Sequence, residues 1–116
     1  MIPHVPDDNS SNYLWAPNQK QIDNAEVSKF ALFIQKKMGF NWKQDFQSLW
    51  QWSIDHTSVF WDLLWDWHGI IGYKGDRVLI APNEMPGAEF FPDAKINFAE
   101  NLLVDPDNRL AICAYG

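Results

Sequence analysis

The side chains in this sequence that most readily carry protons, attack a substrate or bind metal are three histidines and one cysteine. His56 and His68 are twelve residues apart, about 120° around a continuous helix, which is a poor spacing for zinc. No Ser or Cys stands in a recognisable nucleophile turn, so we expect both histidines on a helix surface. Cys113 lies in an apolar run and is expected to be an inert small hydrophobic side chain. The sequence therefore predicts no catalytic residue, metal ligand or cofactor-binding residue.

Glycines that cradle phosphate cluster between a strand and the start of a helix. Gly69, Gly72 and Gly75 are regularly spaced, but no helix start follows them. We therefore do not read them as a nucleotide-binding loop.

Aromatic residues are unusually frequent, with 7 Trp, 8 Phe and 3 Tyr. Each such side chain offers about 150–250 Å² for burial, which is more than a small domain easily encloses. Five of the tryptophans lie at helical spacing and could form a sugar-stacking platform, although helical spacing more often indicates packing: Trp50, Trp52, Trp61, Trp65 and Trp67. Some of these rings are expected near the surface, where they would meet a partner.

Composition excludes several classes of protein. The chain has 116 residues, enough for one domain, and its 9 basic and 15 acidic side chains give a formal charge of −6. An acidic chain without a Lys/Arg cluster is poorly suited to nucleic acid or to an anionic membrane. No apolar stretch approaches the roughly 18 to 20 residues that cross a bilayer. One cysteine excludes an intrachain disulfide, and no signal peptide is recognisable, so we expect a cytoplasmic protein.

Three helices are predicted in the first part of the chain. Residues 1–13 are polar and rich in Pro and Asn and are expected to form a flexible tail. Apolar spacing predicts a helix over 19–38, with a capping box at its start and Gly39 at its end. A second helix is predicted from Asp45, and a third over 55–68, re-capped by Ser53 or Asp55 and closed by Gly69.

The helix predicted over 55–68 has an apolar arc of about 200°, whereas a surface helix needs little more than 100°. It should therefore be covered on two sides. Trp61 and Trp65 lie at one edge of the arc, next to the solvent-facing Asp62, while Leu64 and Trp67 lie on its inner part.

Beyond Gly69 the sequence predicts mostly extended structure. A strand is expected over 77–80, irregular chain over 81–95, a short helix over 94–103 and a buried strand over 110–115. The fold class is mainly α with extended segments: two to four helices plus a short strand or small sheet. A buried strand so close to Gly116 has no obvious neighbour. We therefore expect either that the chain is the N-terminal piece of something longer or that its C-terminus pairs with another molecule.

Three stretches together resemble the N-terminal domain of acetyl-CoA-synthetase-like adenylate-forming ligases. They are LWQWSI at 49–54 followed by Phe60-Trp61, MPGAEFFP at 85–92 and KINFAENLL at 95–103. Their order and spacing resemble most closely the branch of that family that activates acetoacetate. The resemblance covers about residues 14–104, which would form the N-terminal-type domain, with 105–116 as the start of the missing catalytic core.

The resemblance implies an ATP-dependent acid-CoA ligase that forms an acyl-adenylate and then a thioester. ATP, Mg²⁺ and CoA are implied for the full-length enzyme, but the family's phosphate loop and catalytic lysine have no counterpart in this chain. We expect a non-catalytic scaffold that docks on the catalytic core and that self-associates when alone. The alternative is a stand-alone protein-interaction or ligand-binding domain with a Trp-rich surface. The residues expected to dock on the core are Trp50, Trp52, Trp61, Trp65, Phe90, Phe91, Asn97 and Asn101.

Overall fold

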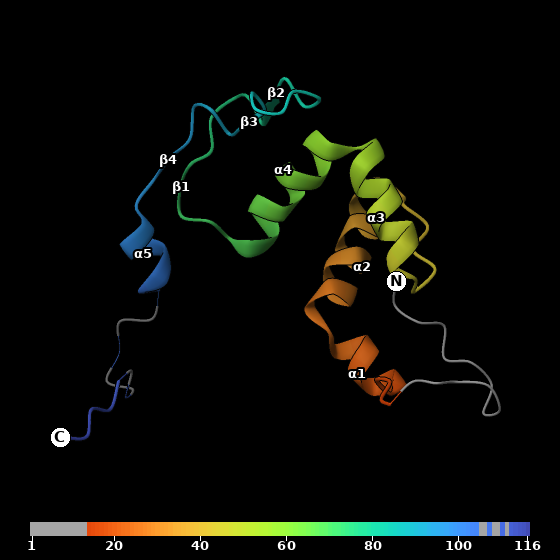
Figure 1. Cartoon of the computed structure of the whole chain (residues 1–116), viewed down its shortest axis with the longest axis horizontal. Coiled ribbons are helices and arrows are strands. Elements are labelled where there is room, and N and C mark those ends of the chain that lie inside the picture. Colours follow the sequence, from red (N-terminus) through yellow and green to blue (C-terminus); the bar gives the residue numbers. More distant parts are fainter. Residues whose placement is uncertain (1–13, 105–106, 108–109, 111) are drawn as a thin grey trace. The chain divides into compact units, whose positions relative to one another are not determined.

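A computed structural model describes residues 14–104, 107, 110 and 112–116 of the chain. The chain divides into two compact units, the first ending at Gly69 and the second beginning at Ile70. In the described residues there are five helices and two antiparallel sheets of two strands each (Figure 1). The predicted mainly α fold with a small sheet is thus confirmed. The predicted tail over 1–13 lies outside the described residues.

The helix predicted over 19–38 is broken in two. α1 (Gln19–Asn24) starts with the predicted capping box, in which the side chains of Asn18 and Gln21 each accept the other's backbone N–H. Ala25 then takes an extended backbone (φ −64°, ψ 139°), and α2 (Glu26–Met38) follows and ends at Gly39 in the left-handed conformation. The prediction of one continuous helix was therefore wrong. Alanine is the best helix former, so Ala25 gives no signal in the sequence for a break.

α3 (Phe46–Asp55) begins where it was predicted. Asp45 caps it, because its two carboxylate oxygens accept from the backbone N–H groups of Gln47 (2.9 Å) and Ser48 (3.2 Å). A carboxylate at this position also interacts favourably with the positive end of the helix dipole.

α4 (Thr57–His68) is capped differently from the prediction. Its N-cap residue is His56, whose side chain makes no capping hydrogen bond. Ser53 and Asp55 cannot serve as caps because α3 uses them: the Ser53 hydroxyl donates to the Trp50 carbonyl at 2.7 Å, and Asp55 accepts from Gln51 at 3.0 Å. Gly69 closes α4 in the left-handed conformation, as predicted.

The core of the first unit is built by α2, α3 and α4. The buried apolar residues are Phe30, Ala31, Ile34, Trp42, Leu49 and Leu63. A shell of half-buried side chains packs against them: Phe33, Phe40, Trp52, Val59, Phe60, Leu64 and Trp67. Leu64 and Trp67 are therefore on the inner part of the α4 arc, as their helical angles predicted.

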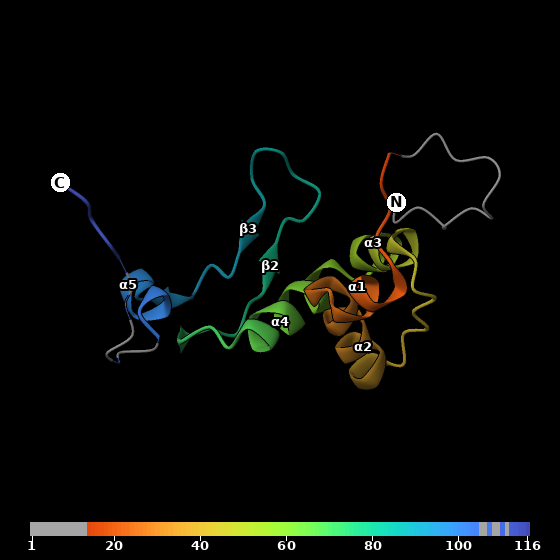
Figure 2. The same cartoon turned by 90° about the horizontal axis from the view of Figure 1, so that it is seen from below.

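The second unit contains an antiparallel hairpin and a short helix. β1 (Gly72–Tyr73) pairs with β4 (Lys95–Ile96). β2 (Leu79–Ile80) pairs with β3 (Glu89–Phe90), and these two strands lie side by side in Figure 2. The strand predicted over 77–80 is thus present in its second half. α5 (Phe98–Leu102) starts four residues later than predicted, because Lys95–Ile96 is held in the sheet by β1.

The buried strand predicted over 110–115 is wrong for the residues that the structure describes there. Leu110, Ile112 and Tyr115 belong to no strand and are exposed, and Ala111 lies outside the described residues. A strand requires a neighbour for its backbone groups, and none pairs with these residues. In the described part of the chain, no helix combines the length and the apolar character needed to span a membrane.

One polar side chain lies inside the core region of α2. Ser28 is 2% exposed, and its hydroxyl has no hydrogen-bond partner among the described residues. A buried hydroxyl without a partner destabilises the folded state, because it gives up its hydrogen bonds to water.

The burial of α2 predicts opposite outcomes at two of its positions. Ile34→Ala should lower the free energy of unfolding by about 2–5 kcal/mol, because it leaves a cavity in the core. Ser28→Ala should leave that free energy unchanged or raise it, since it removes an unpaired hydroxyl and favours the helix. Urea unfolding of the whole chain, followed by circular dichroism, measures both. A loss of more than about 1 kcal/mol in Ser28→Ala would show that the hydroxyl is hydrogen-bonded after all.

Candidate functional site

The eight residues predicted to dock on a partner come from both units. Four tryptophans lie on α3 and α4 in the first unit, and two phenylalanines and two asparagines lie in the hairpin and α5 of the second. We describe each group within its own unit.

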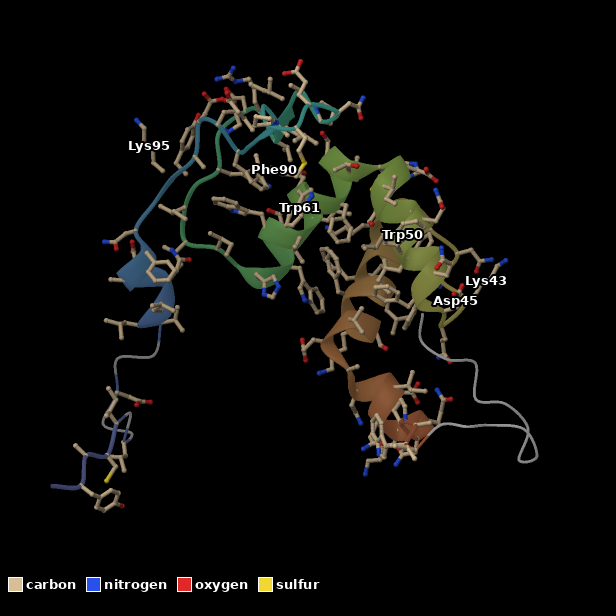
Figure 3. The ribbon with its side chains drawn as sticks, viewed as in Figure 1. Lys43, Asp45, Trp50, Trp61, Phe90 and Lys95 are labelled. Carbon is tan, nitrogen blue, oxygen red and sulfur yellow. The ribbon has the colours of Figure 1, made fainter. Side chains whose placement is uncertain are left out.

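Trp50 on α3 and Trp61 on α4 have the most exposed rings of the four tryptophans. Trp50 is 45% exposed and Trp61 is 37% exposed (Figure 3). Trp61 packs edge-on against Phe60, at 5.6 Å between ring centroids. Both residues therefore combine contacts to their own unit with apolar surface that faces solvent.

Trp52 and Trp65 are half-buried. Trp52 packs against the core, with its ring centroid 5.4 Å from that of Phe40, and it stacks nearly parallel on the His56 ring at 5.0 Å. His56 thus lies on a helix end and contacts an aromatic ring and the Trp52 carbonyl (Nδ1 to O, 3.2 Å). The docking role of these four tryptophans stays a prediction.

A pocket of about 280 Å³ opens between α2, α3 and α4. Aromatic and aliphatic side chains form most of its wall, including Phe30, Phe46, Leu49, Trp50, Leu64 and Trp67. Sequence reasoning did not find this pocket. Some of its lining residues, such as Phe30 and Leu49, also belong to the core, and apolar spacing along a helix does not show where neighbouring helices leave a gap.

The polar groups at this pocket are already hydrogen-bonded or ion-paired, or lie at a helix end. Glu26 accepts from the Lys29 ammonium at 2.6 Å, and the Ser53 hydroxyl donates to the Trp50 carbonyl. His68 is the last residue of α4. Because most of its wall is apolar, the pocket is suited to apolar contact.

Phe90 and Phe91 point their rings into different environments. Phe90 lies in β3 opposite Leu79 and is 48% exposed. Phe91 follows it with a positive φ of 48° and is half-buried, and its N–H donates to the Val78 carbonyl at 2.8 Å. Phe91 lies just past the end of β3, where its left-handed backbone departs from the strand.

Asn97 and Asn101 hold α5 in place. The Asn97 side-chain oxygen caps α5 by accepting from Ala99 and Glu100. The Asn101 amide accepts from the Ile71 N–H at 2.8 Å and donates to the Ile71 carbonyl at 2.8 Å and to the Asn97 carbonyl at 2.9 Å. It therefore pairs with Ile71 much as a neighbouring strand would, which sequence reasoning missed.

An exposed ion pair joins the two sides of the hairpin. Arg77 donates from Nε to Asp93 Oδ2 at 2.7 Å and from Nη2 to Oδ1 at 2.5 Å. The hydrogen bonds from Arg77, reinforced by its charge, outweigh the effect of partial burial and hold the pKa of Asp93 below its ordinary value. In the part of the chain that the structure describes, no group of His, Cys, Asp and Glu could hold a metal ion. Cys113 is exposed rather than buried in a strand, which corrects its predicted place.

The three bonds of the Asn101 amide predict a specific defect. In Asn101→Asp the carboxylate can still accept from the Ile71 N–H, but it cannot donate to the carbonyls of Ile71 and Asn97 and repels them. We expect faster hydrogen exchange of the amides of β1 and α5, by about fivefold or more, since about 1 kcal/mol is lost for each bond. The first unit serves as the internal control and should be unaffected. Unchanged exchange at Ile71 would contradict the bridging role.

Comparison with known proteins identifies relatives over most of the chain. It is 31% identical to an acetoacetyl-coenzyme A synthetase of Rhizobium meliloti (strain 1021) over 90 residues, and 30% identical to an acetoacetyl-CoA synthetase of Danio rerio over 107 residues. These matches cover 78% and 90% of the chain. A malonamoyl-CoA synthetase of Penicillium aethiopicum is 39% identical over 82 residues, 69% of the chain.

The chain spans only 14% and 16% of the length of the first two relatives, and 11% of the third. No family model matches it, and no solved structure matches it. By its sequence the chain is therefore similar to one stretch of the acetoacetyl-CoA synthetases rather than to their whole length.

Proposed function

We propose that this chain is a non-catalytic docking and scaffolding module of a cytoplasmic acid-CoA ligase, with acetoacetate as the acid. Its similarity to acetoacetyl-CoA synthetases supports the reaction class. The observation that carries the docking role is the exposure of Trp50 and Trp61 on the same helices that build the core of the first unit. Tryptophan rings that are partly packed and partly in solvent are typical anchors of protein interfaces.

The chemistry of such a ligase defines what the module leaves to its partner. Activation of a carboxylate by ATP needs donors and Mg²⁺ around the triphosphate and a cation near the acid, and the thioester step needs a site for CoA. In this proposal the ATP, Mg²⁺ and CoA sites lie on the catalytic core. The module contributes a folded surface on which that core is seated.

The packing of α4 explains how the exposed surface around Trp61 is held in place. Trp67, on the inner face of α4, packs on Phe30 and Phe33, with centroids 5.9 Å and 5.2 Å apart. Trp61, six residues earlier, is on a different part of the helix and keeps over a third of its surface in solvent. One helix thus supplies both a packing face and a face available for docking.

A stand-alone ligand-binding domain is the second candidate, and the apolar pocket beside Trp50 favours it. A pocket of about 280 Å³ lies near the lower limit for small-molecule sites. The two functions require different residues. Docking requires the exposed ring of Trp61, which does not line the pocket, whereas ligand binding requires the residues of the pocket wall.

Two tryptophans on α4 distinguish docking from folding. Trp67→Ala should unfold the first unit, because truncating a packed tryptophan costs about 3–5 kcal/mol, comparable with the total stability of a small domain. Trp61→Ala should stay folded by circular dichroism but bind at least tenfold more weakly to a catalytic core. That core can be the Rhizobium meliloti relative from which the 90-residue stretch that aligns with this chain has been deleted. Affinity is measured by calorimetry.

Trp15→Ala is the matched control, because Trp15 is 70% exposed and is not among the residues expected to dock. It should leave both folding and affinity unchanged. If Trp61→Ala unfolds the chain as Trp67→Ala does, or binds the core with unchanged affinity, the docking assignment is wrong. Sedimentation without the core shows whether the exposed rings instead bring together two copies of this chain.

The division of labour predicts the catalytic behaviour of the separate parts. The purified chain should support no acetoacetate-dependent exchange of pyrophosphate into ATP. Adding it to the deleted Rhizobium core should raise the exchange rate of that core. Exchange by the chain alone would show that the activating groups are present in it and would overturn the proposal.

A further inference from the structure

α5 turns a polar side chain toward its own unit and apolar side chains toward solvent. Of residues 95–104, Asn101 alone is not exposed. Its amide accepts from the Ile71 N–H at 2.8 Å and donates to the Ile71 carbonyl at 2.8 Å, so this side of the helix faces the chain next to β1. A surface helix normally buries its apolar stripe and exposes its polar side. α5 has the reverse arrangement.

The exposed apolar side chains of α5 form one face. At about 100° per residue, Phe98, Ala99 and Leu102 lie within an arc of about 100°. Phe98 is 72% exposed, and Leu102, about one turn further along, is 64% exposed. Leu103 and Val104 follow directly and are exposed as well. Phe98, Ala99 and Leu102 are called the α5 face below.

The β1–β4 pair next to α5 is exposed in the same way. Tyr73 in β1 and Ile96 in β4 both keep more than half of their surface in solvent. Among the described residues no further strand pairs with either of these strands. A contiguous stretch of large apolar side chains in solvent is typical of a surface that meets a partner.

The second unit buries its own apolar side chains elsewhere. The half-buried ones include residues of β2 and the residues on either side of the hairpin next to it: Val78, Leu79, Ile80 and Phe91. The α5 face is therefore not the side on which this unit builds its interior.

The relatives indicate what covers the α5 face. A match over 90% of the 116 residues leaves out at most 12 of them, so the stretch shared with the Danio rerio relative includes residues 13–104 and all of α5. That stretch is only 16% of the relative. The remainder is a much larger body of protein on which an apolar face can be seated.

We propose that the α5 face docks on the catalytic core of the ligase, with Phe98 and Leu102 as its two anchors. This inference rests on the proposed function and adds a contact on the second unit to the tryptophan surface of α3 and α4. The core is expected to meet α5 with an apolar surface, because the α5 face offers no polar group to pair with a buried charge. Asn97 and Asn101 are positioning residues, since their hydrogen bonds cap α5 and tie it to Ile71.

A full-length chimera tests the contact. The stretch of the Danio rerio relative that aligns with this chain is replaced by residues 13–104. Hydroxyl radicals label side chains according to their access to solvent, and mass spectrometry locates the label. Phe98 and Leu102 should be labelled about fivefold more slowly in the chimera than in the isolated chain, because the centre of an interface is fully buried. The isolated chain, mixed with the relative from which this stretch is deleted, gives the same comparison without a chimera.

Leu32 is the matched control for the labelling. It is also a leucine on a helix, α2, and is 52% exposed, but it belongs to neither proposed contact. Its labelling should be equal in the isolated chain and in the chimera.

Leu102→Ala separates docking from folding. In the isolated chain it should leave hydrogen exchange of α5 and of the Ile71 amide unchanged, because the side chain lies in solvent and alanine favours a helix. In the chimera it should speed exchange of the α5 amides by about tenfold, because it leaves a cavity at the interface. Leu32→Ala should not change the exchange of α5 in either protein. An equal effect of Leu102→Ala in both proteins would show that Leu102 stabilises its own unit, and the proposal would be wrong.

Trp61 distinguishes failure of this proposal from failure of the proposed function. Unchanged labelling of Phe98 and Leu102, together with slower labelling of Trp61 in the chimera, would overturn the α5 contact alone. Unchanged labelling of all three would overturn both. Labelling of Phe98 that falls as the concentration of the isolated chain rises would identify a second copy of the chain as the occupant, and would also overturn the contact with the core.

Discussion

The packing of α4 against α2 and α3 is the interaction on which the first unit depends. Ala31 and Ile34 are completely buried at its centre, and a small residue beside a large one lets the helices approach. Aromatic rings then fill the remaining space, with Trp67 packed on Phe30 and Phe33. The pocket lies between these three helices, and the exposed Trp50 and Trp61 lie on two of them.

The aromatic content of the chain exceeds what this small core can enclose. Trp42 is buried and Trp52 and Trp67 pack around the core, but Trp50 and Trp61 keep a large part of their rings in solvent. Both residues also contribute to their own unit, since Trp61 packs edge-on against Phe60 and Trp50 lines the pocket. A partner for their exposed surface is the subject of the docking proposal.

Polar contacts link the elements of the second unit. Its described residues include no fully buried side chain, and Asn97, Asn101, Arg77 and Asp93 connect its strands and helix through hydrogen bonds. Such contacts are individually weak in water, so local opening is easier here than in the helical unit. A unit of this kind depends on close geometry, which is why Gly75 meets Asp93 with no room for a side chain.

The sequence by itself determined the features that depend on local chemistry. The capping box at Asn18, the start of a helix near Asp45 and the closing glycines Gly39 and Gly69 were all predicted, because each depends on hydrogen bonds, apolar spacing or backbone freedom within a few residues. The inner position of Trp67 also followed from helical spacing.

Only the tertiary structure decided the features that depend on distant residues. The break at Ala25 has no local signal, and α5 starts late because β1, more than twenty residues earlier, holds Lys95 and Ile96 in a sheet. Sequence reasoning selected Asn97 and Asn101 for docking, but their bonds to backbone groups appear only when the chain folds back on itself. The pocket beside Trp50 likewise is lined by residues of three helices, whose packing apolar spacing alone does not specify.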